Sequence, residues 1–131
     1  MTKIFKTEEE WKKQLSEDEF LVTRKKGTEP PFSGNKFDSN KDGYFKCICC
    51  EEILFHSNTK YESNSGWPSF FESYSKNCIK KETDKSHGMT RTEVLCNKCD
   101  SHLGHLFDDG PQPTGKRYCI NSLSLKFEEF E

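Results

Sequence analysis

The spacing of hydrophobic residues changes along the chain, from a helical period near the N-terminus to short strand-like runs after residue 43. At the start, Thr7 and Glu10 match the capping-box pattern that begins many helices. Trp11 and Leu15 follow four residues apart, so they would share one face of a helix. We therefore predict a short helix over residues 8–15.

A second capping pattern follows directly. Ser16 and Glu19 precede Phe20 with the same spacing, which predicts a second helix, shorter than the first. The double proline in residues 28–32 restricts the residue before each proline, so this segment is predicted to be extended. Residues 33–43 are polar and end in Asp-Gly, which indicates a loop closed by a turn.

The remaining hydrophobic residues form short aromatic or β-branched runs, which are typical of strands. The predicted strands cover residues 44–47, 53–55, 89–95, 103–107 and 118–125. Turn signals such as Asp109-Gly110-Pro111 separate them. The pattern predicts a mainly β domain of antiparallel strands behind a small helical N-terminus.

Composition adds a constraint on stability. The 131 residues fit one domain with a single core, but only 31% are hydrophobic and 11 are Phe, so the core should be small and aromatic. A domain short of aliphatic side chains needs another source of stability. Its seven cysteines can supply it by binding a metal.

Charge and hydropathy exclude several classes of protein. The net charge is −2 and Lys and Glu are interspersed, which argues against a nucleic-acid partner. The N-terminus lacks the apolar region of a signal peptide, and no apolar run reaches membrane-spanning length. We expect a soluble cytoplasmic protein without a membrane partner, in which cysteines are metal ligands or redox groups rather than structural disulfides.

Two C-x-x-C pairs predict a metal site. Cys47 with Cys50, and Cys96 with Cys99, each end a predicted strand and together offer four thiolates to one tetrahedral ion, for which zinc is the common choice. Four protein ligands close the coordination sphere, so the zinc would be structural. Cys49 inside the first pair leaves a poorer chelate open, and iron in a rubredoxin-like site is the alternative metal.

One cysteine lies outside these pairs among polar residues. In extended geometry Arg117, Cys119 and Asn121 project to one side of the predicted strand. The cation would favour a thiolate, and the amide could donate to a developing negative charge. A buried cysteine acting as a small hydrophobic side chain is the plainer interpretation. The pattern makes Cys119 a candidate nucleophile.

Two further stretches are weak signals when each is taken alone. The His pair in His102-Leu103-Gly104-His105 is more often a surface or core feature. Gly66-Trp67-Pro68-Ser69-Phe70 is an apolar turn whose indole could line a pocket but is more often core packing.

Together, however, these stretches resemble the B-type peptide-methionine (R)-S-oxide reductases, from about Phe20 to Phe127. The matching motifs are Gly27-Thr28-Glu29-Pro30-Pro31-Phe32, both cysteine pairs, Gly66-Trp67-Pro68-Ser69-Phe70, Ser86-His87-Gly88-Met89, His102-Leu103-Gly104-His105, Asp109-Gly110-Pro111 and Arg117-Tyr118-Cys119-Ile120-Asn121-Ser122. The resemblance implies two antiparallel sheets tied by zinc with short N-terminal helices. Residues 1–131 would form a single domain, with a helical segment over 1–19 and the zinc-bound catalytic β domain over 20–127.

The resemblance also implies a reaction. Cys119 would attack the sulfur of methionine-R-sulfoxide in oxidised proteins or peptides and end as a sulfenic acid. The reaction would return the residue to methionine and so repair the protein after oxidative stress. His105, with His102, would supply the proton, and Asn121 would hold the polarised oxygen.

Three residues would support this chemistry. Trp67 would form the wall for the substrate's methyl group, Arg117 would favour the thiolate, and Asp109 would orient a histidine or the arginine. A methyl slot opposite a polar oxygen slot would select one epimer.

The chain departs from the family pattern at the recycling step. Many members have a second cysteine where Ser65 stands here. Cys78 is a possible resolving residue, Cys49 is a poorer one, and direct reduction of the sulfenic acid by a thioredoxin-like protein is favoured because it needs no second cysteine. We expect a monomer.

Two other functions fit part of the pattern. A thiol hydrolase could use Cys119, His105 and Asn121, although a chain of this length can hardly build a deep peptide cleft. A non-catalytic binding module could keep both cysteine pairs but has no need of the stretch around Cys119.

Overall fold

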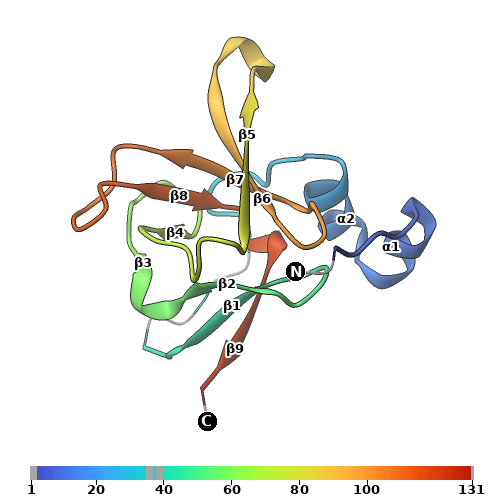
Figure 1. The fold of residues 1–131 in the computed structure, drawn as a ribbon, viewed down its shortest axis with the longest axis horizontal. Helices are drawn as coiled ribbons and strands as arrows, with labels where there is room; N and C mark the ends of the chain where they lie inside the picture. The colour runs from blue at the N-terminus through green and yellow to red at the C-terminus, as the bar shows by residue number, and fades with distance from the viewer. Residues whose placement is uncertain (1–2, 35–36, 38–39, 131) are drawn as a thin grey trace.

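The computed structural model describes residues 3–34, 37 and 40–130. Within them the chain forms two antiparallel sheets and two short α-helices, joined by turns and three single 3₁₀ turns (Figure 1). This confirms the predicted fold class. Among the described residues, no helix has the length and apolar character needed to cross a membrane.

The two helices begin at the predicted caps. Helix α1 spans Glu8–Gln14 and helix α2 spans Glu17–Arg24, and each is preceded by a complete capping box. The prediction that the second helix is the shorter one is wrong, because α2 has 8 residues and α1 has 7. The buried face of α2 continues past Phe20 to Val22 and Thr23, so its packing against β7 extends the helix.

The smaller sheet has the order β2-β1-β9. Strand β1 (Gly43–Cys47) lies between β2 (Ile53–His56) and β9 (Leu125–Glu129). Phe45 of β1 is the register partner of Phe55 on one side and Phe127 on the other. The middle strand thus contributes a row of aromatic side chains to the core.

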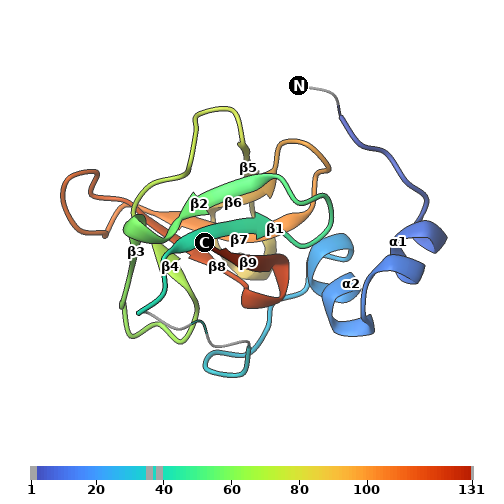
Figure 2. The same ribbon diagram turned by 90° about the horizontal axis from the view of Figure 1, so that it is seen from below.

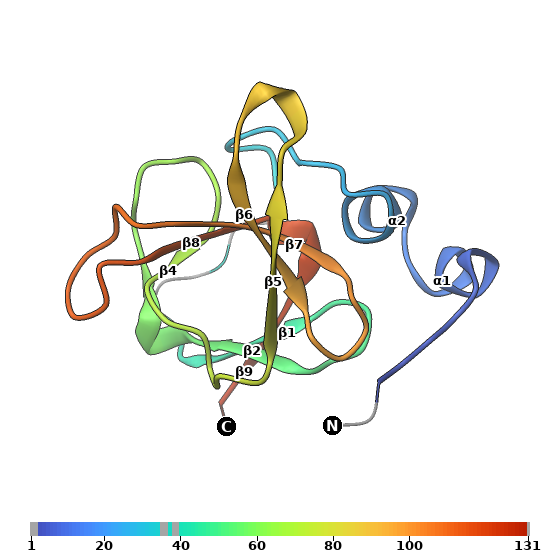
Figure 3. The same cartoon turned by 45° about the horizontal axis from the view of Figure 1, so that its top comes forward.

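The larger sheet has the order β3-β4-β8-β7-β6-β5. Its strands are β3 (Lys60–Tyr61), β4 (Ser69–Phe70), β8 (Arg117–Ile120), β7 (His102–Phe107), β6 (Arg91–Cys96) and β5 (Ile79–Asp84). The hairpin of β5 and β6 projects from the body of the molecule, and Figures 2 and 3 show both helices beside one end of the sheets. The tip of this hairpin carries the 3₁₀ turn η2 (Ser86–Gly88).

The predicted strand over residues 118–125 is wrong in one respect. Strand β8 ends at Ile120, the chain turns through η3 (Ser122–Ser124), and β9 begins at Leu125 in the other sheet. Hydrogen bonds from the Asn121 N–H to Leu103 O and from the Ser124 N–H to Asn121 O fix this corner. A run of hydrophobic residues cannot reveal such a corner, because both strands carry the same alternation.

The prediction that residues 28–32 are extended is also only partly correct. Phe32 has a φ of 63°, and its N–H donates to Gly66 O at 2.7 Å. The prolines restrict the residues before them but leave Phe32 free to turn. Similarly, the strand predicted over 89–95 starts only at Arg91, after the η2 turn.

The core between the sheets is aromatic, as the composition predicts. Phe55 and Phe70 stack with ring centroids 4.2 Å apart, and Phe45 meets Phe70 edge-on at 5.0 Å. Leu103 of β7 and Ile120 of β8 are fully buried in the same cluster. One face of the large sheet packs on this core. Side chains on the opposite face of β7 and β8 are therefore available to form a site.

Candidate active site and metal centre

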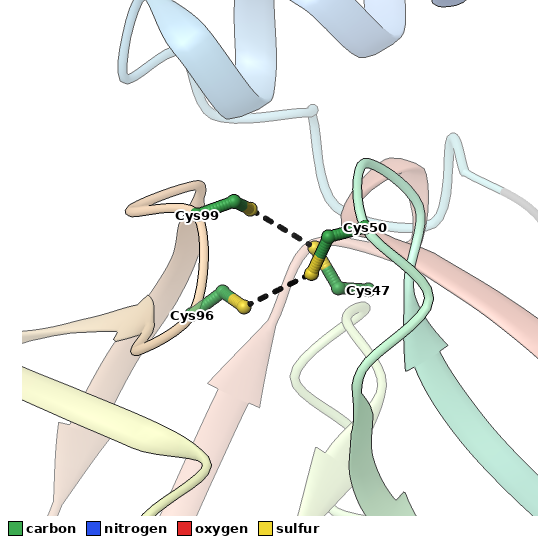
Figure 4. Close-up of side chains that lie close together, drawn as sticks. All are labelled: Cys47, Cys50, Cys96 and Cys99. Atoms are coloured by element: carbon green, nitrogen blue, oxygen red, sulfur yellow. Dashed lines mark hydrogen bonds between the residues drawn. The ribbon is translucent and has the colours of Figure 1, made fainter. Parts of the chain in front are cut away.

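Two identical turns bring the four paired cysteines together (Figure 4). Cys47 and Cys50 come from the turn after β1, and Cys96 and Cys99 come from the turn after β6. In both turns the N–H of the residue after the second cysteine donates to the carbonyl of the first, at 2.8 Å. The residues that donate, Glu51 and Asp100, both have a φ of 62°.

The sulfur geometry fits a four-thiolate ion. All four Sγ atoms lie within 4.8 Å of one another, with 3.7 Å between Cys47 and Cys99 and 3.6 Å between Cys50 and Cys96. A tetrahedral zinc with Zn–S bonds of about 2.3 Å places its sulfurs about 3.8 Å apart. The donor set therefore fits zinc. Cys49 is buried but lies outside this cluster, so the cluster uses the two outer cysteines of the first turn.

The N-terminal segment binds both of these turns. Gln14 donates its side-chain N–H to Cys49 O at 2.5 Å, and Arg24 donates to Cys99 O at 2.8 Å. The Ile4 N–H donates to Lys98 O at 2.8 Å. Arg24 in turn lies over the Trp11 ring at 4.5 Å. The helices are thus anchored to the cysteine turns on both sides of the cluster.

A cavity of about 230 Å³ lies on the other face of the large sheet. Its lining residues are Thr28, Trp67, Arg91, Gly104, His105, Phe107, Arg117, Cys119 and Asn121. Five of these are residues that the sequence singled out. His102 lines a neighbouring cavity, and Asp109 lines a shallow cavity beside Ser65.

Cys119 is half-buried at the centre of this arrangement. It is the cross-strand partner of His105, and its Sγ lies 3.9 Å from the Ser65 hydroxyl. Burial raises the pKa of the Cys119 thiol above its ordinary value, and the Ser65 hydroxyl and then the Arg117 charge offset part of that rise. The Arg117 charge thus acts toward the thiolate, but burial outweighs it.

Arg117 is held by Asp109 rather than directed only at the thiol. Its guanidinium donates from Nε to Oδ1 at 2.8 Å and from a terminal nitrogen to Oδ2 at 3.2 Å. It also lies over the Phe107 ring at 4.3 Å. The hydrogen bond from Arg117 holds the pKa of Asp109 below its usual range. Of the two partners expected for Asp109, the arginine is the one it contacts.

His105 is positioned by Asp84, a residue that the sequence analysis missed. Its Nε2 lies 2.8 Å from Asp84 Oδ2, and Arg91 reaches the same oxygen at 3.4 Å. The Ser86 hydroxyl and N–H, followed by His105, lower the pKa of Asp84. An ionised Asp84 orients the imidazole and can balance a positive charge on it. Only the pairing of β5 with β6, which sets Asp84 opposite Arg91, brings it here.

His102 has a different environment. It is buried, with Nδ1 2.7 Å from Glu93 Oε2, and Lys26 lies 3.3 Å from the other Glu93 oxygen. Burial lowers the pKa of His102 against the opposing effect of Glu93. The His102 and His105 ring centroids are 5.6 Å apart. His102 is thus a buried neighbour of His105 whose neutral form is favoured by burial.

Cys78 lies away from the cavity. It is 2% exposed, its Sγ lies 3.3 Å from Ser75 O, and it packs in the core cluster that also contains Tyr118. Tyr118 and Cys119 are adjacent in β8, so their side chains point to opposite faces of the sheet.

Comparison with known proteins identifies the family. The SelR domain model matches residues 15–129. The chain is 55% identical over 127 residues to the peptide methionine sulfoxide reductase MsrB of Hahella chejuensis (strain KCTC 2396), covering 97% of this chain and 91% of that protein. It is also 55% identical over 123 residues to the Escherichia coli (strain K12 / DH10B) protein of the same name, covering 94% and 90%. The chain therefore belongs to the SelR domain family.

Proposed function

We propose that this protein reduces methionine sulfoxide in oxidised proteins and peptides to methionine, and that it acts on the R epimer at sulfur. The observation that supports this most directly is that one cavity contains a thiol, a histidine, an amide and an indole, from Cys119, His105, Asn121 and Trp67. The curated relatives are named for the same reaction class.

Cys119 supplies the electrons for the reaction. Its sulfur attacks the sulfoxide sulfur, the sulfur–oxygen bond breaks, and the oxygen ends on Cys119 as a sulfenic acid. Methionine sulfur gains two electrons and Cys119 loses two. Burial raises the pKa of the Cys119 thiol and so favours its protonated form. His105, its cross-strand partner, would pass a proton to the sulfoxide oxygen.

The proposed selectivity rests on the mixed apolar and polar lining of the cavity. Trp67 offers an apolar wall for the methyl group, whereas His105 and Asn121 offer polar groups to the oxygen. A sulfoxide sulfur is chiral, so the other epimer would place its oxygen against the indole.

A structural zinc would be held by Cys47, Cys50, Cys96 and Cys99. When bound, the ion supplies a cross-link between the two cysteine turns and no open coordination position. This cross-link joins β1 of the small sheet to β6 of the large sheet.

Recycling is proposed to use an external thioredoxin-like dithiol. One thiol attacks the sulfenic acid to give a mixed disulfide and water, and the second thiol then releases Cys119. Two positions support this route: Ser65 occupies the place beside Cys119, and Cys78 lies in the core.

The contacts of Asn121 argue against the thiol-hydrolase alternative. Its amide donates to Leu103 O at 3.0 Å, and the partner of His105 is Asp84. An asparagine that orients the histidine of a Cys-His-Asn hydrolase would contact that histidine.

The test is reduction of a methionine-sulfoxide peptide with the two epimers separated and dithiothreitol as reductant. We expect turnover of the R epimer by the wild type and by Cys78→Ser. Cys119→Ser should be inactive, since a hydroxyl is a far poorer nucleophile at neutral pH. Comparable turnover of the S epimer, or activity of Cys119→Ser, would contradict the proposal.

A further inference from the structure

We propose that Glu29 is a positioning residue that holds the Trp67 indole and the Asn121 amide in the orientations that the reaction requires. This inference rests on the proposed function, because it explains how the methyl wall and the oxygen donor are fixed. Glu29 lies in the loop after α2, 38 residues before Trp67 and 92 residues before Asn121. It nevertheless contacts both.

The main chain of Glu29 makes the two contacts. Trp67 donates its indole Nε1–H to the Glu29 carbonyl at 2.8 Å. The Glu29 N–H donates to Asn121 Oδ1 at 3.1 Å. A displacement of this one residue would therefore move the partners of both side chains at once.

The side chain of Glu29 fixes that main chain in place. It is 3% exposed and accepts hydrogen bonds from the Ser122 hydroxyl at 3.0 and 2.9 Å and from the Leu123 N–H at 2.9 Å. A buried carboxylate without such donors would be costly, so the loop is strongly held at this point. Gly34 closes over it, since an added Cβ there would overlap Glu29 and Ser122.

Trp67 needs this support because it lines two hollows. One is the reaction cavity of about 230 Å³, and the other is a cavity of about 300 Å³ that also contains Phe32 and Tyr61. With empty space beside it in both, close packing cannot by itself determine the angle of the indole. The hydrogen bond to Glu29 O supplies the missing restraint.

Asn121 needs its contact with Glu29 for a different reason. An amide can rotate so that its oxygen and nitrogen exchange places. Because Oδ1 accepts from the Glu29 N–H and Nδ2 donates to Leu103 O at 3.0 Å, only one orientation satisfies both partners. The second N–H of Nδ2 is then the donor assigned to the sulfoxide oxygen.

The experiment compares Glu29→Ala with Glu29→Gln in the zinc-loaded protein. Alanine removes the anchor, whereas glutamine retains an acceptor for the Leu123 N–H and a polar partner for Ser122. We expect Glu29→Ala to lower kcat/KM per folded molecule by about tenfold to a hundredfold, the usual cost of a small misplacement of reacting groups. Glu29→Gln should recover most of this loss. Glu72→Ala, at an exposed carboxylate, is the matched control and should behave as wild type.

A second readout separates positioning from a merely structural role. The indole N–H signal of Trp67 and the side-chain amide signals of Asn121 are followed by NMR and assigned with Trp67→Phe and Asn121→Asp. In Glu29→Ala both sets should shift and exchange faster with solvent, while the indole signal of Trp11 should not change. Unchanged Trp67 and Asn121 signals would overturn the proposal, even if activity or stability fell.

The outcomes for the two proposals are distinguishable. If the wild type does not reduce methionine sulfoxide, the proposed function fails, and the NMR signals still decide whether Glu29 positions the two side chains. If Glu29→Ala does not fold, Ser122→Ala decides the question, because it retains the Glu29 side chain but removes one of the donors that anchor its carboxylate. Shifts at Trp67 and Asn121 in Ser122→Ala support the proposal, and their absence rejects it.

Discussion

Burial and polar neighbours shift the pKa of the Cys119 thiol in opposite directions. Burial raises its pKa, while the Ser65 hydroxyl and Arg117 lower it in part. Arg117 is shared with Asp109 through two hydrogen bonds, which reduces the net positive charge that the thiol experiences. Burial thus favours the protonated thiol at rest, and in the proposed mechanism proton transfer through His105 would be part of its activation.

The contact between Asp84 and His105 leads to a prediction at the residue scale. His105→Ala should reduce kcat by about 100-fold, the typical contribution of a lost proton donor. Asp84→Asn should reduce kcat by about tenfold or more, because a neutral amide neither fixes the ring nor balances its positive charge. Steady-state kinetics with the R epimer provides the measurement.

The neighbouring strand position supplies the control for this prediction. Glu82→Gln changes an exposed carboxylate on β5 that pairs with Lys80, and its kcat should match wild type. Equal kcat values for Asp84→Asn and Glu82→Gln would show that the Asp84 contact has no role in the reaction.

Among the elements, the two cysteine turns bring the small and the large sheet together at one shared centre. Each turn leaves its strand in the same way and presents two sulfurs to the shared centre. Helices α1 and α2 add hydrogen bonds from Gln14 and Arg24 to the same turns. The cluster therefore connects the small sheet, the large sheet and the N-terminal helices.

This arrangement predicts the effect of losing one ligand. Cys96→Ser should lose metal and much of its folded population, because metal binding worth on the order of 10 kcal/mol is coupled to folding in such sites. Metal content by elemental analysis and unfolding by circular dichroism give the measurement. Cys49→Ser is the control, since Cys49 is buried beside the cluster but outside it. A metal-free Cys96→Ser protein that unfolds at the wild-type temperature would contradict the structural role.

For the whole molecule, recycling depends on which thiols the fold places on the cavity side of the large sheet. Cys119 faces the cavity, whereas Cys78 is buried in the core. One turnover without reductant should consume one thiol in the wild type and one in Cys78→Ser, counted by alkylation and mass spectrometry after metal removal. Ser65→Cys should consume two, because position 65 adjoins the Cys119 sulfur. Loss of two thiols in the wild type and one in Cys78→Ser would identify Cys78 as the resolving residue.

The buried His102 predicts a pH dependence of stability. Its pKa is lowered in the folded state from 6.5, and the groups facing it are Glu93, His105 and Lys26. As the pH falls below about 6.5, His102 therefore binds a proton in the unfolded chain but not yet in the folded protein. Its contribution to the free energy of unfolding should be complete above this pH and should decrease as the pH falls toward the pKa of His102 in the folded protein.

Urea unfolding of the metal-loaded protein between pH 7.5 and 5.5 measures this dependence. His102→Gln should flatten the decrease, whereas His87→Gln, at an exposed turn, should retain it. An equal slope in wild type and His102→Gln would show that another group controls acid stability.

The sequence by itself determined the features that depend on neighbouring residues. The capping boxes at Thr7 and Ser16 and the two C-x-x-C turns are local, because their hydrogen bonds join residues three or four positions apart. The alternation around Cys119 likewise predicted that Arg117, Cys119 and Asn121 would project to one side of the strand, and all three line one cavity.

The tertiary structure alone decided the contacts between distant segments. Asp84 meets His105, Glu93 meets His102, and Glu29 meets Trp67 and Asn121 because sheet register and loop packing bring them together. The corner after Ile120 and the placement of Cys78 in the core have the same origin. Each depends on which strands pair and on which face is buried, and that choice minimises the free energy of the whole chain rather than of any one segment.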